Sequence, residues 1–263
     1  MNHYLQVAQE IAREAGRLLL AEFHRPRAVE YKTEVDIVTA ADRKAEEFIV
    51  DRLHTHFPQH AWIAEEGSRR ESETDYCWYV DPLDGTTNFA HGYPVFCVSL
   101  ALVRGSEILV GVVFDPVREE MYHAGQGEGA WLNQRPIRVS AVKSLSESLV
   151  ATGFPTRKRH KHPNVAYFHR FTQLTHGVRR DGSAALDLCY VACGRFDGFW
   201  ELNLNPWDTA AGVLLVREAG GLVTNFQGGP FRLDSEETLA TNRQIHAEMQ
   251  QVLVQATAEA ARG

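Results

Sequence analysis

The sequence lacks the features that direct a protein into a membrane or along a secretory route. No apolar run approaches membrane-spanning length, and the N-terminus shows no basic-then-apolar signal pattern. The four cysteines include no Cys-x-x-Cys pair. Cys189 and Cys193 stand one helical turn apart, which leaves a weak metal or redox pair open. Without nearby His ligands, we interpret them as small buried apolar residues and expect a cytoplasmic protein with reduced thiols.

An excess of positive charge is also missing. The chain has 27 Lys and Arg against 34 Asp and Glu, which gives a formal net charge of −7. Nucleic-acid surfaces are normally basic, so nucleic-acid binding is not expected. The short basic run 157–162 is interpreted as a solvated loop, with attraction of a phosphate or an acidic partner as the alternative. The 263 residues, 44% hydrophobic and 23% charged, suffice for one large or two small globular units.

The most informative stretch that is present is residues 81–89, DPLDGTTNF. The aromatic and β-branched run 78–80 predicts a buried strand that ends at Asp81, and Asp84 leads into a short helix or tight turn. Carboxylate oxygens at a strand end suit Mg²⁺, and backbone amides at a helix start suit anions. From these nine residues alone, an Asp-Gly turn with a capping acid is an equal alternative.

Three further acids also stand at the predicted ends of elements. Asp42 lies in the first turn of a helix expected up to about residue 56, and Glu65 follows a strand at 62–64. Asp208 takes the third position of a helix that begins at Pro206, where the missing N–H of proline costs nothing. Each of these acids also has a purely structural explanation, as a partner of the helix dipole or a solvated loop charge.

The remaining pattern predicts a mixed α and β protein. Amphipathic helices are expected at 3–24 and 244–260, and the runs 95–103 and 108–114 form a hairpin, which makes part of the sheet antiparallel. Residues 69–76 are expected to form a polar loop. A change from strands to mixed elements near residue 145 suggests an N-terminal part, 1–145, and a C-terminal part, 146–263, within one catalytic unit.

Taken together, these motifs resemble the inositol monophosphatase family. The resemblance covers nearly the whole chain, and it is carried by Glu65-Glu66, residues 81–89, and Pro206-Trp207-Asp208 followed by Ala211-Gly212, with residues 36–42, 182–185 and 197–201 in support. It implies an α/β fold of layered αβαβα type, with a largely antiparallel N-terminal sheet and a second mixed sheet. It also implies a homodimer that hydrolyses phosphate monoesters with two to three Mg²⁺ ions per site.

The resemblance further implies a role for individual residues. The implied metal ligands are Glu65, Asp81, the Leu83 carbonyl, Asp84 and Asp208. The implied catalytic residues are Asp42, Glu65 and Thr86. The implied substrate-binding residues are Asp84, Gly85, Thr86, Gly182, Ser183, Ala184 and Glu201. The loop at 32–34 is one residue shorter than in close animal relatives, which leaves its contribution to a third metal open.

General chemistry agrees with these roles. Hydrolysis of a phosphate monoester needs an acceleration approaching ~10²¹-fold, and paired cations suit such a displacement. The sequence contains no Cys-x₅-Arg phosphatase motif and no evident Ser-His-Asp order. Crowded carboxylates repel one another, so we expect them to be protonated or partly disordered when no metal is bound.

Several substrates and one different function stay open. Glu201, after Phe199-Trp200, favours a phosphorylated polyol, with inhibition by Li⁺ as the resemblance implies. Fructose 1,6-bisphosphate, histidinol phosphate and 3′-phosphoadenosine 5′-phosphate are alternatives, and Asp181 adds a negative charge that keeps histidinol phosphate in consideration. The alternative from another class is a regulatory protein that binds the transcription machinery.

Overall fold

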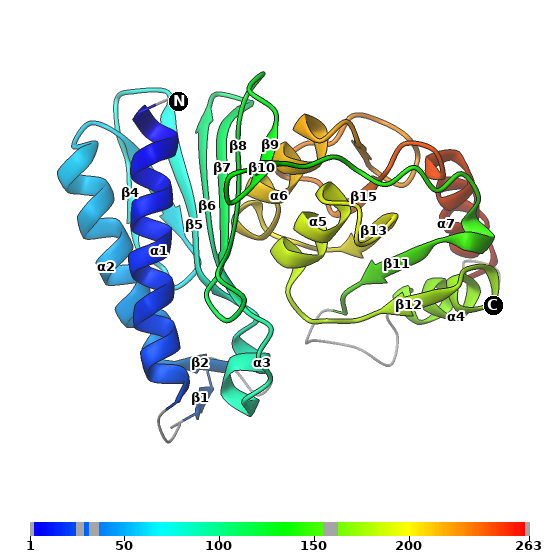
Figure 1. Ribbon diagram of the computed structural model, residues 1–263, viewed down its shortest axis with the longest axis horizontal. Coiled ribbons are helices and arrows are strands. Elements are labelled where there is room, and N and C mark those ends of the chain that lie inside the picture. The colour runs from blue at the N-terminus through cyan, green and yellow to red at the C-terminus, as the bar shows by residue number, and fades with distance from the viewer. Residues whose placement is uncertain (1–2, 25–28, 32–36, 155–162, 261–263) are drawn as a thin grey trace.

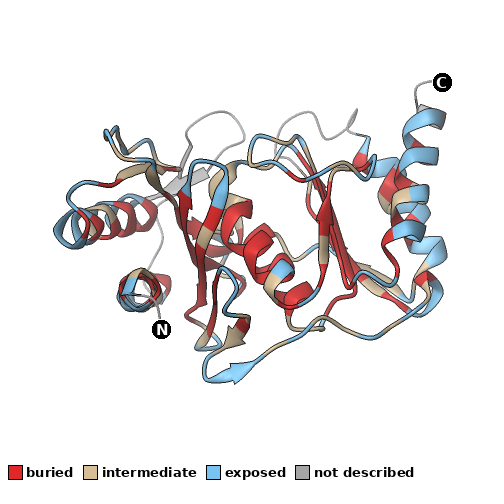
Figure 2. Ribbon diagram, turned by 90° about the horizontal axis from the view of Figure 1, so that it is seen from above, coloured by how far each residue is buried: buried red, intermediate tan, exposed pale blue. Residues whose placement is uncertain are grey.

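The fold has five layers, and a computed structural model describes residues 3–24, 29–31, 37–154 and 163–260 of the chain. Helices and sheets alternate across the molecule, which Figures 1 and 2 show from two directions. The outer helices on one side are α1 (His3–Phe23) and α2 (Ala40–His56), those between the sheets are α5 (Ala184–Ala192) and α6 (Pro206–Glu218), and those on the far side are α4 (Asn164–Leu174) and α7 (His246–Ala260). The expected αβαβα layering is therefore confirmed.

The first sheet has eight strands in the order β10-β9-β8-β7-β6-β5-β3-β4. The strands are β3 (Ala61–Ala64), β4 (Arg69–Arg70), β5 (Tyr76–Asp84), β6 (Cys97–Arg104), β7 (Glu107–Asp115), β8 (Glu120–Gly125), β9 (Ala130–Leu132) and β10 (Arg135–Pro136). All neighbouring pairs are antiparallel except β3 and β5. The predicted hairpin is thus confirmed as β6 and β7.

Two local expectations for this sheet were wrong. The polar stretch 69–76 was expected to be a loop, but its first residues form the edge strand β4, because they pair with Trp62 and Ile63 of β3. Strand β5 was expected to end at Asp81, but it continues to Asp84 with a register irregularity between the two acids. Both the formation of β4 and the length of β5 depend on pairing with another strand, which the local sequence pattern does not encode.

The second sheet has five strands in the order β12-β11-β13-β15-β14. They are β11 (Leu149–Thr152), β12 (Gly177–Arg179), β13 (Gly198–Leu202), β14 (Leu222–Thr224) and β15 (Glu237–Thr241). Strand β11 runs parallel to both of its neighbours, whereas β15 is antiparallel to β13 and β14, so the sheet is mixed as expected. Outside the two large sheets lie β1 (Val29–Tyr31), β2 (Ile37–Thr39), α3 (Thr86–His91) and the 3₁₀ turn Leu145–Glu147.

The core between the sheets brings distant parts of the chain together. Helix α6 crosses β7 so closely that a Cβ on Gly111 would lie 2.7 Å from the Ala211 carbonyl oxygen. Cys189 is buried in this core and Cys193 packs against it, as the apolar interpretation of both predicted. On the outer face, the apolar stripe of α1 is buried against the first sheet. Among the described residues, no helix is both long and apolar enough to cross a membrane.

Candidate active site

A cavity of about 420 Å³ lies where the ends of β5 and β13 meet the starts of α3, α5 and α6. Most of the expected site residues line it, although they come from very different parts of the chain. Those lining residues are Glu65, Asp84, Gly85, Thr86, Gly182, Ser183, Ala184, Glu201 and Asp208. A larger cavity of about 840 Å³ lies on the outer face beside α1 and contains none of them.

The stretch 81–89 folds as a strand, a left-handed turn and a short helix. The Asp81 carboxylate accepts a hydrogen bond from the Leu83 N–H at 3.0 Å and so bends the end of β5. Gly85 then adopts φ 97°, and a Cβ there would lie 2.8 Å from the Val95 carbonyl oxygen, so only glycine fits without strain. The predicted short helix follows as α3, and Gly85, Thr86 and Thr87 at its start line the cavity.

Thr86 and Asp42 meet behind the rim of the cavity. The Thr86 hydroxyl lies 3.0 Å from Asp42 Oδ1 and 3.0 Å from the Leu83 carbonyl oxygen, and it can donate its single proton to one of them at a time. Asp42 is fully buried. Neither Asp42, Asp81 nor Leu83 lines the cavity directly, so the structure places these three expected site residues just beneath its wall.

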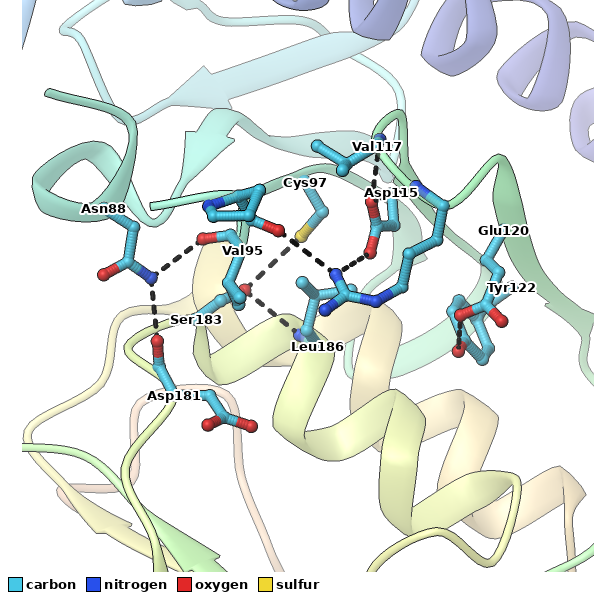
Figure 3. Close-up of polar contacts among 12 residues, drawn as sticks. Asn88, Val95, Cys97, Asp115, Val117, Glu120, Tyr122, Asp181, Ser183 and Leu186 are labelled. Atoms are coloured by element: carbon cyan, nitrogen blue, oxygen red, sulfur yellow. Dashed lines mark hydrogen bonds and ion pairs between the residues drawn. The ribbon is translucent and has the colours of Figure 1, made fainter. Parts of the chain in front are cut away.

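Asp84 joins the two halves of the chain at the start of α5. Its Oδ2 accepts hydrogen bonds from the Ser183 hydroxyl and from the Ala185 N–H, both at 2.7 Å. Ser183 is also the N-cap of α5, where its side chain accepts from the Leu186 N–H (Figure 3). Asn88 adds a second link, because its amide donates to the carbonyl oxygens of Val95 and Asp181.

Asp208 and Glu65 are held by local backbone contacts. Asp208 closes the capping box of α6, since its Oδ2 accepts from the Asn205 N–H at 2.7 Å, and this confirms the predicted helix start. The N–H of Glu65 donates to the Val80 carbonyl oxygen at 3.1 Å, which keeps Glu65 beside the end of β5. The next residue, Glu66, donates its backbone N–H to the buried Glu46 carboxylate at 2.7 Å.

The acids of the site strongly disfavour ionisation together. Burial raises the pKa of Asp81 well above its usual value, and Glu65, Asp84 and Asp208 raise it further. Burial and the neighbouring Asp84 raise the pKa of Asp208 to about 7, and burial followed by Asp208 and Asp84 raises the pKa of Glu201 to about 8. This is the direction expected for crowded carboxylates in a site without cations.

The side chains do not form a closed ligand set as they stand. Within the described ranges, no group of three or more His, Cys, Asp or Glu side chains is positioned to hold a metal ion. One reason is that Oδ2 of Asp84 and Oδ2 of Asp208 are both engaged by protein donors. The acids therefore share one small region without yet converging on one point.

Sequence reasoning missed two charged residues that line the cavity, Arg180 and Asp187. Asp187 lies one helical turn after the cap residue Ser183, and that spacing could have pointed to it. Asp181 does not itself line the cavity, but burial and then the charge of Asp181 raise the pKa of Asp187, so the expected negative charge lies close to the cavity wall. The basic run 157–162 and the loop 32–34 lie outside the described residues.

The fold and site define a known class: the chain belongs to the inositol monophosphatase family, whose model matches residues 1–261. It is 46% identical to an inositol-1-monophosphatase of Synechocystis sp. over 95% of this chain and 88% of that protein. It is also 46% identical to the Nus factor SuhB of Pseudomonas aeruginosa, over 92% of each. Among solved structures, the inositol monophosphatase of Thermotoga maritima has a TM-score of 0.91 and 38% identity, covering 98% of this chain and all of that one (100%).

Proposed function

We propose that this chain is a Mg²⁺-dependent phosphate monoester hydrolase that converts myo-inositol phosphate and water into myo-inositol and phosphate. The observation that carries the proposal is the meeting of Glu65, Asp84 and Asp208 with the Gly85-Thr86 turn in one cavity. Its volume, about 420 Å³, falls in the usual range for small-ligand sites. Membership of the family supports the same assignment.

The donor atoms fit a hard divalent cation. We assign the ligands to Glu65, Asp81, the Leu83 carbonyl, Asp84 and Asp208, all of which offer oxygen, as Mg²⁺ prefers. Burial raises the pKa of Asp84, and burial together with repulsion from neighbouring acids raises the pKa of Asp81 and Asp208; bound cations would relieve part of this repulsion. Because the acids do not yet form a closed set, binding two to three ions requires them to move together. When bound, Mg²⁺ supplies Lewis-acid polarisation of the phosphoryl group and more acidic water.

The chain's own groups orient the reactants. The backbone N–H groups of Gly85 and Thr86 bind phosphate oxygens, which the left-handed turn at Gly85 leaves room to approach. The attacking water bonds to the Thr86 hydroxyl, whose proton in turn bonds to Asp42, so this pair receives the proton that the water gives up. Glu65 lies on the same cavity wall and helps to orient the water.

The leaving alcohol is assigned to the other side of the cavity. Gly182, Ser183 and Ala184 form the start of α5 there, and Glu201 enters from β13. Carboxyl and hydroxyl groups at these positions suit the hydroxyls of a polyol. Among the residues that the structure describes, the cavity acids outnumber the one cation that lines it, Arg180, which disfavours a second phosphate on the alcohol and so ranks fructose 1,6-bisphosphate lower.

A phosphate-release assay tests this proposal. Purified protein is given myo-inositol 1-phosphate, histidinol phosphate, fructose 1,6-bisphosphate and 3′-phosphoadenosine 5′-phosphate, with and without Mg²⁺. We expect the highest kcat/KM for the inositol ester, loss of turnover in chelator, recovery with Mg²⁺, and inhibition by Li⁺. Absence of phosphate release from all four esters at saturating Mg²⁺ refutes the assignment.

A second candidate function is favoured by the relatives named Nus factor SuhB, which match as closely as the relatives named for the phosphatase. In that case the chain, as a homodimer in the cytoplasm, binds a protein of the transcription machinery. Co-purification with RNA polymerase and Nus factors, using Asp84→Asn in parallel, separates the two functions. Binding that survives in the variant supports a role independent of catalysis, and absence of binding in wild type rejects this candidate.

A further inference from the structure

Asp187 is a buried acid with an unmet hydrogen-bonding need at the wall of the cavity. It is 1% exposed, and within the described part of the chain its Oδ1 has no hydrogen-bond partner. It lies one turn into α5, and side chains on a helix tilt toward the N-terminal end, which here faces the cavity with Ser183 and Glu201. Asp187 therefore belongs to the cavity wall beside the space where the leaving alcohol is assigned.

Two other buried aspartates have donors at both carboxylate oxygens. Asp115 accepts from the Val117 N–H (Figure 3). It also accepts from the Arg118 N–H and pairs with the Arg118 guanidinium. Asp197 accepts from the Ser140 hydroxyl at 2.5 Å and the Leu149 N–H at 2.7 Å. Among the described residues, Asp187 Oδ1 is the carboxylate oxygen that stays buried without a donor.

An unpaired buried carboxyl has a cost that the fold alone does not explain. Burying such a group without a partner is unfavourable, and a place near the helix N-terminus offsets only part of this cost. Groups that break a packing rule in this way are expected where a ligand completes the interaction. A hydroxyl can complete it in either protonation state, because it donates to a carboxylate and pairs equally with a neutral acid.

We propose that Asp187 is a substrate-binding residue that receives a hydroxyl of the leaving alcohol and makes the site selective for polyol esters over esters without hydroxyls. This inference rests on the proposed phosphatase function. Asp187 and Glu201 line the same cavity as the Gly85-Thr86 turn, and we assign the first two to the alcohol and the turn to the phosphate. Its contribution therefore depends on the alcohol and leaves phosphate binding unchanged.

A pair of ring-matched substrates tests this inference in the Asp187→Leu variant. Myo-inositol 1-phosphate and cyclohexyl phosphate have the same ring size, but only the first carries hydroxyls. Loss of one hydrogen bond to this buried acid predicts a fall of about tenfold in kcat/KM for the inositol ester. The value for cyclohexyl phosphate is expected to stay within about twofold, since that ester has no donor for Asp187.

The Tm for thermal unfolding separates a binding role of Asp187 from a purely structural role. If Asp187 only stabilised the fold, its replacement would lower the Tm. Removing an unpaired buried carboxyl is expected to raise the Tm of the metal-free protein by about 2–4 °C. The matched control, Asp115→Asn, breaks engaged contacts, so it should lower the Tm and leave the ratio of the two esters unchanged. Asp187→Asn, which keeps the shape and an acceptor, provides a second variant and should retain most of the selectivity.

The outcomes separate this inference from the function on which it rests. An equal fall for both esters, or an unchanged ratio, overturns the role of Asp187 while the phosphatase assignment stands. Hydrolysis of neither ester by wild type refutes the phosphatase function itself, and Asp187 then has no alcohol to bind. The inference is supported if Asp187→Leu lowers the ratio of kcat/KM for the inositol ester to that for cyclohexyl phosphate and also raises the Tm.

Discussion

Glu201 allows the electrostatics of the site to be tested without any substrate. It is 8% exposed, and burial, followed by Asp208 and Asp84, raises its pKa from 4.5 to about 8. A folded-state pKa above the unfolded value means that stability is full below about pH 4.5 and is lost as the pH rises through about 8. The difference between these two pKa values corresponds to a loss of about 5 kcal/mol of unfolding free energy once Glu201 is fully ionised.

We expect the metal-free protein to gain about 2 kcal/mol from Glu201 when the pH falls from about 8 to about 6, a rise of roughly 4–8 °C in Tm. Three buried histidines act in the opposite direction: burial lowers the pKa of His60 and His123, and that of His246 to about 4. Their contribution cancels when wild type is compared with Glu201→Gln at each pH. Calorimetry in chelator should show the variant more stable at pH 8 and the difference shrinking toward pH 6.

The result that would refute this reasoning is a stability difference between wild type and Glu201→Gln that does not change with pH. Such a result would mean that Glu201 ionises freely and that the site is not the crowded, poorly solvated cluster described above. Saturating Mg²⁺ supplies a further check. Cations beside Asp84 and Asp208 should lower the pKa of Glu201 and move the pH dependence to more acidic values.

Three other predictions concern the turn that follows β5. Asp84→Asn should abolish phosphate release while the circular dichroism spectrum stays that of wild type. Gly85→Ala should cost about 1–3 kcal/mol in chemical denaturation, because a Cβ there meets the Val95 carbonyl oxygen at 2.8 Å and φ is 97°. Gly105→Ala, also at positive φ but with open space around it, should cost only about 1 kcal/mol. Thr86→Val should lower kcat by about 10²–10⁴-fold in steady-state assays, since it removes the hydroxyl that orients the water.

Each of these has its own contrary outcome. Turnover by Asp84→Asn at the wild-type rate would exclude the acid from the chemistry, and equal costs for the two glycine variants would show that the contact with Val95 is relaxed. Unchanged kcat in Thr86→Val would remove Thr86 from the proton path. Thr86→Ser keeps the hydroxyl and should retain most of the activity, which controls for loss of packing.

Much of the fold could be predicted because it follows from local physics. The stripe of small and apolar residues on 3–24 predicts α1, since a helix with one apolar face must bury it. Pro206 and Asp208 place the start of α6 correctly because capping depends on neighbouring residues alone. The Asp-Gly step at 84–85 similarly predicts the turn before α3.

The contacts between distant segments could not be predicted in this way. Strand β4 forms because two arginines pair with β3, and β5 extends past Asp81 because β6 continues to pair with it. The link from Asp84 to the start of α5 joins residues 101 positions apart. That the acids lie in one site was predicted from the family resemblance, because periodicity and capping rules say nothing about contacts between distant segments.

By itself, then, the sequence determined most of the helices and strands, though not β4 or the end of β5, and it determined to which family the chain is similar. Only the tertiary structure decided that Asp187 lines the cavity while Asp181 does not, and that Asp187 is buried without a donor whereas Asp115 and Asp197 have several. The physical reason is that a hydrogen-bonding need becomes visible only after packing has removed water and fixed every possible partner.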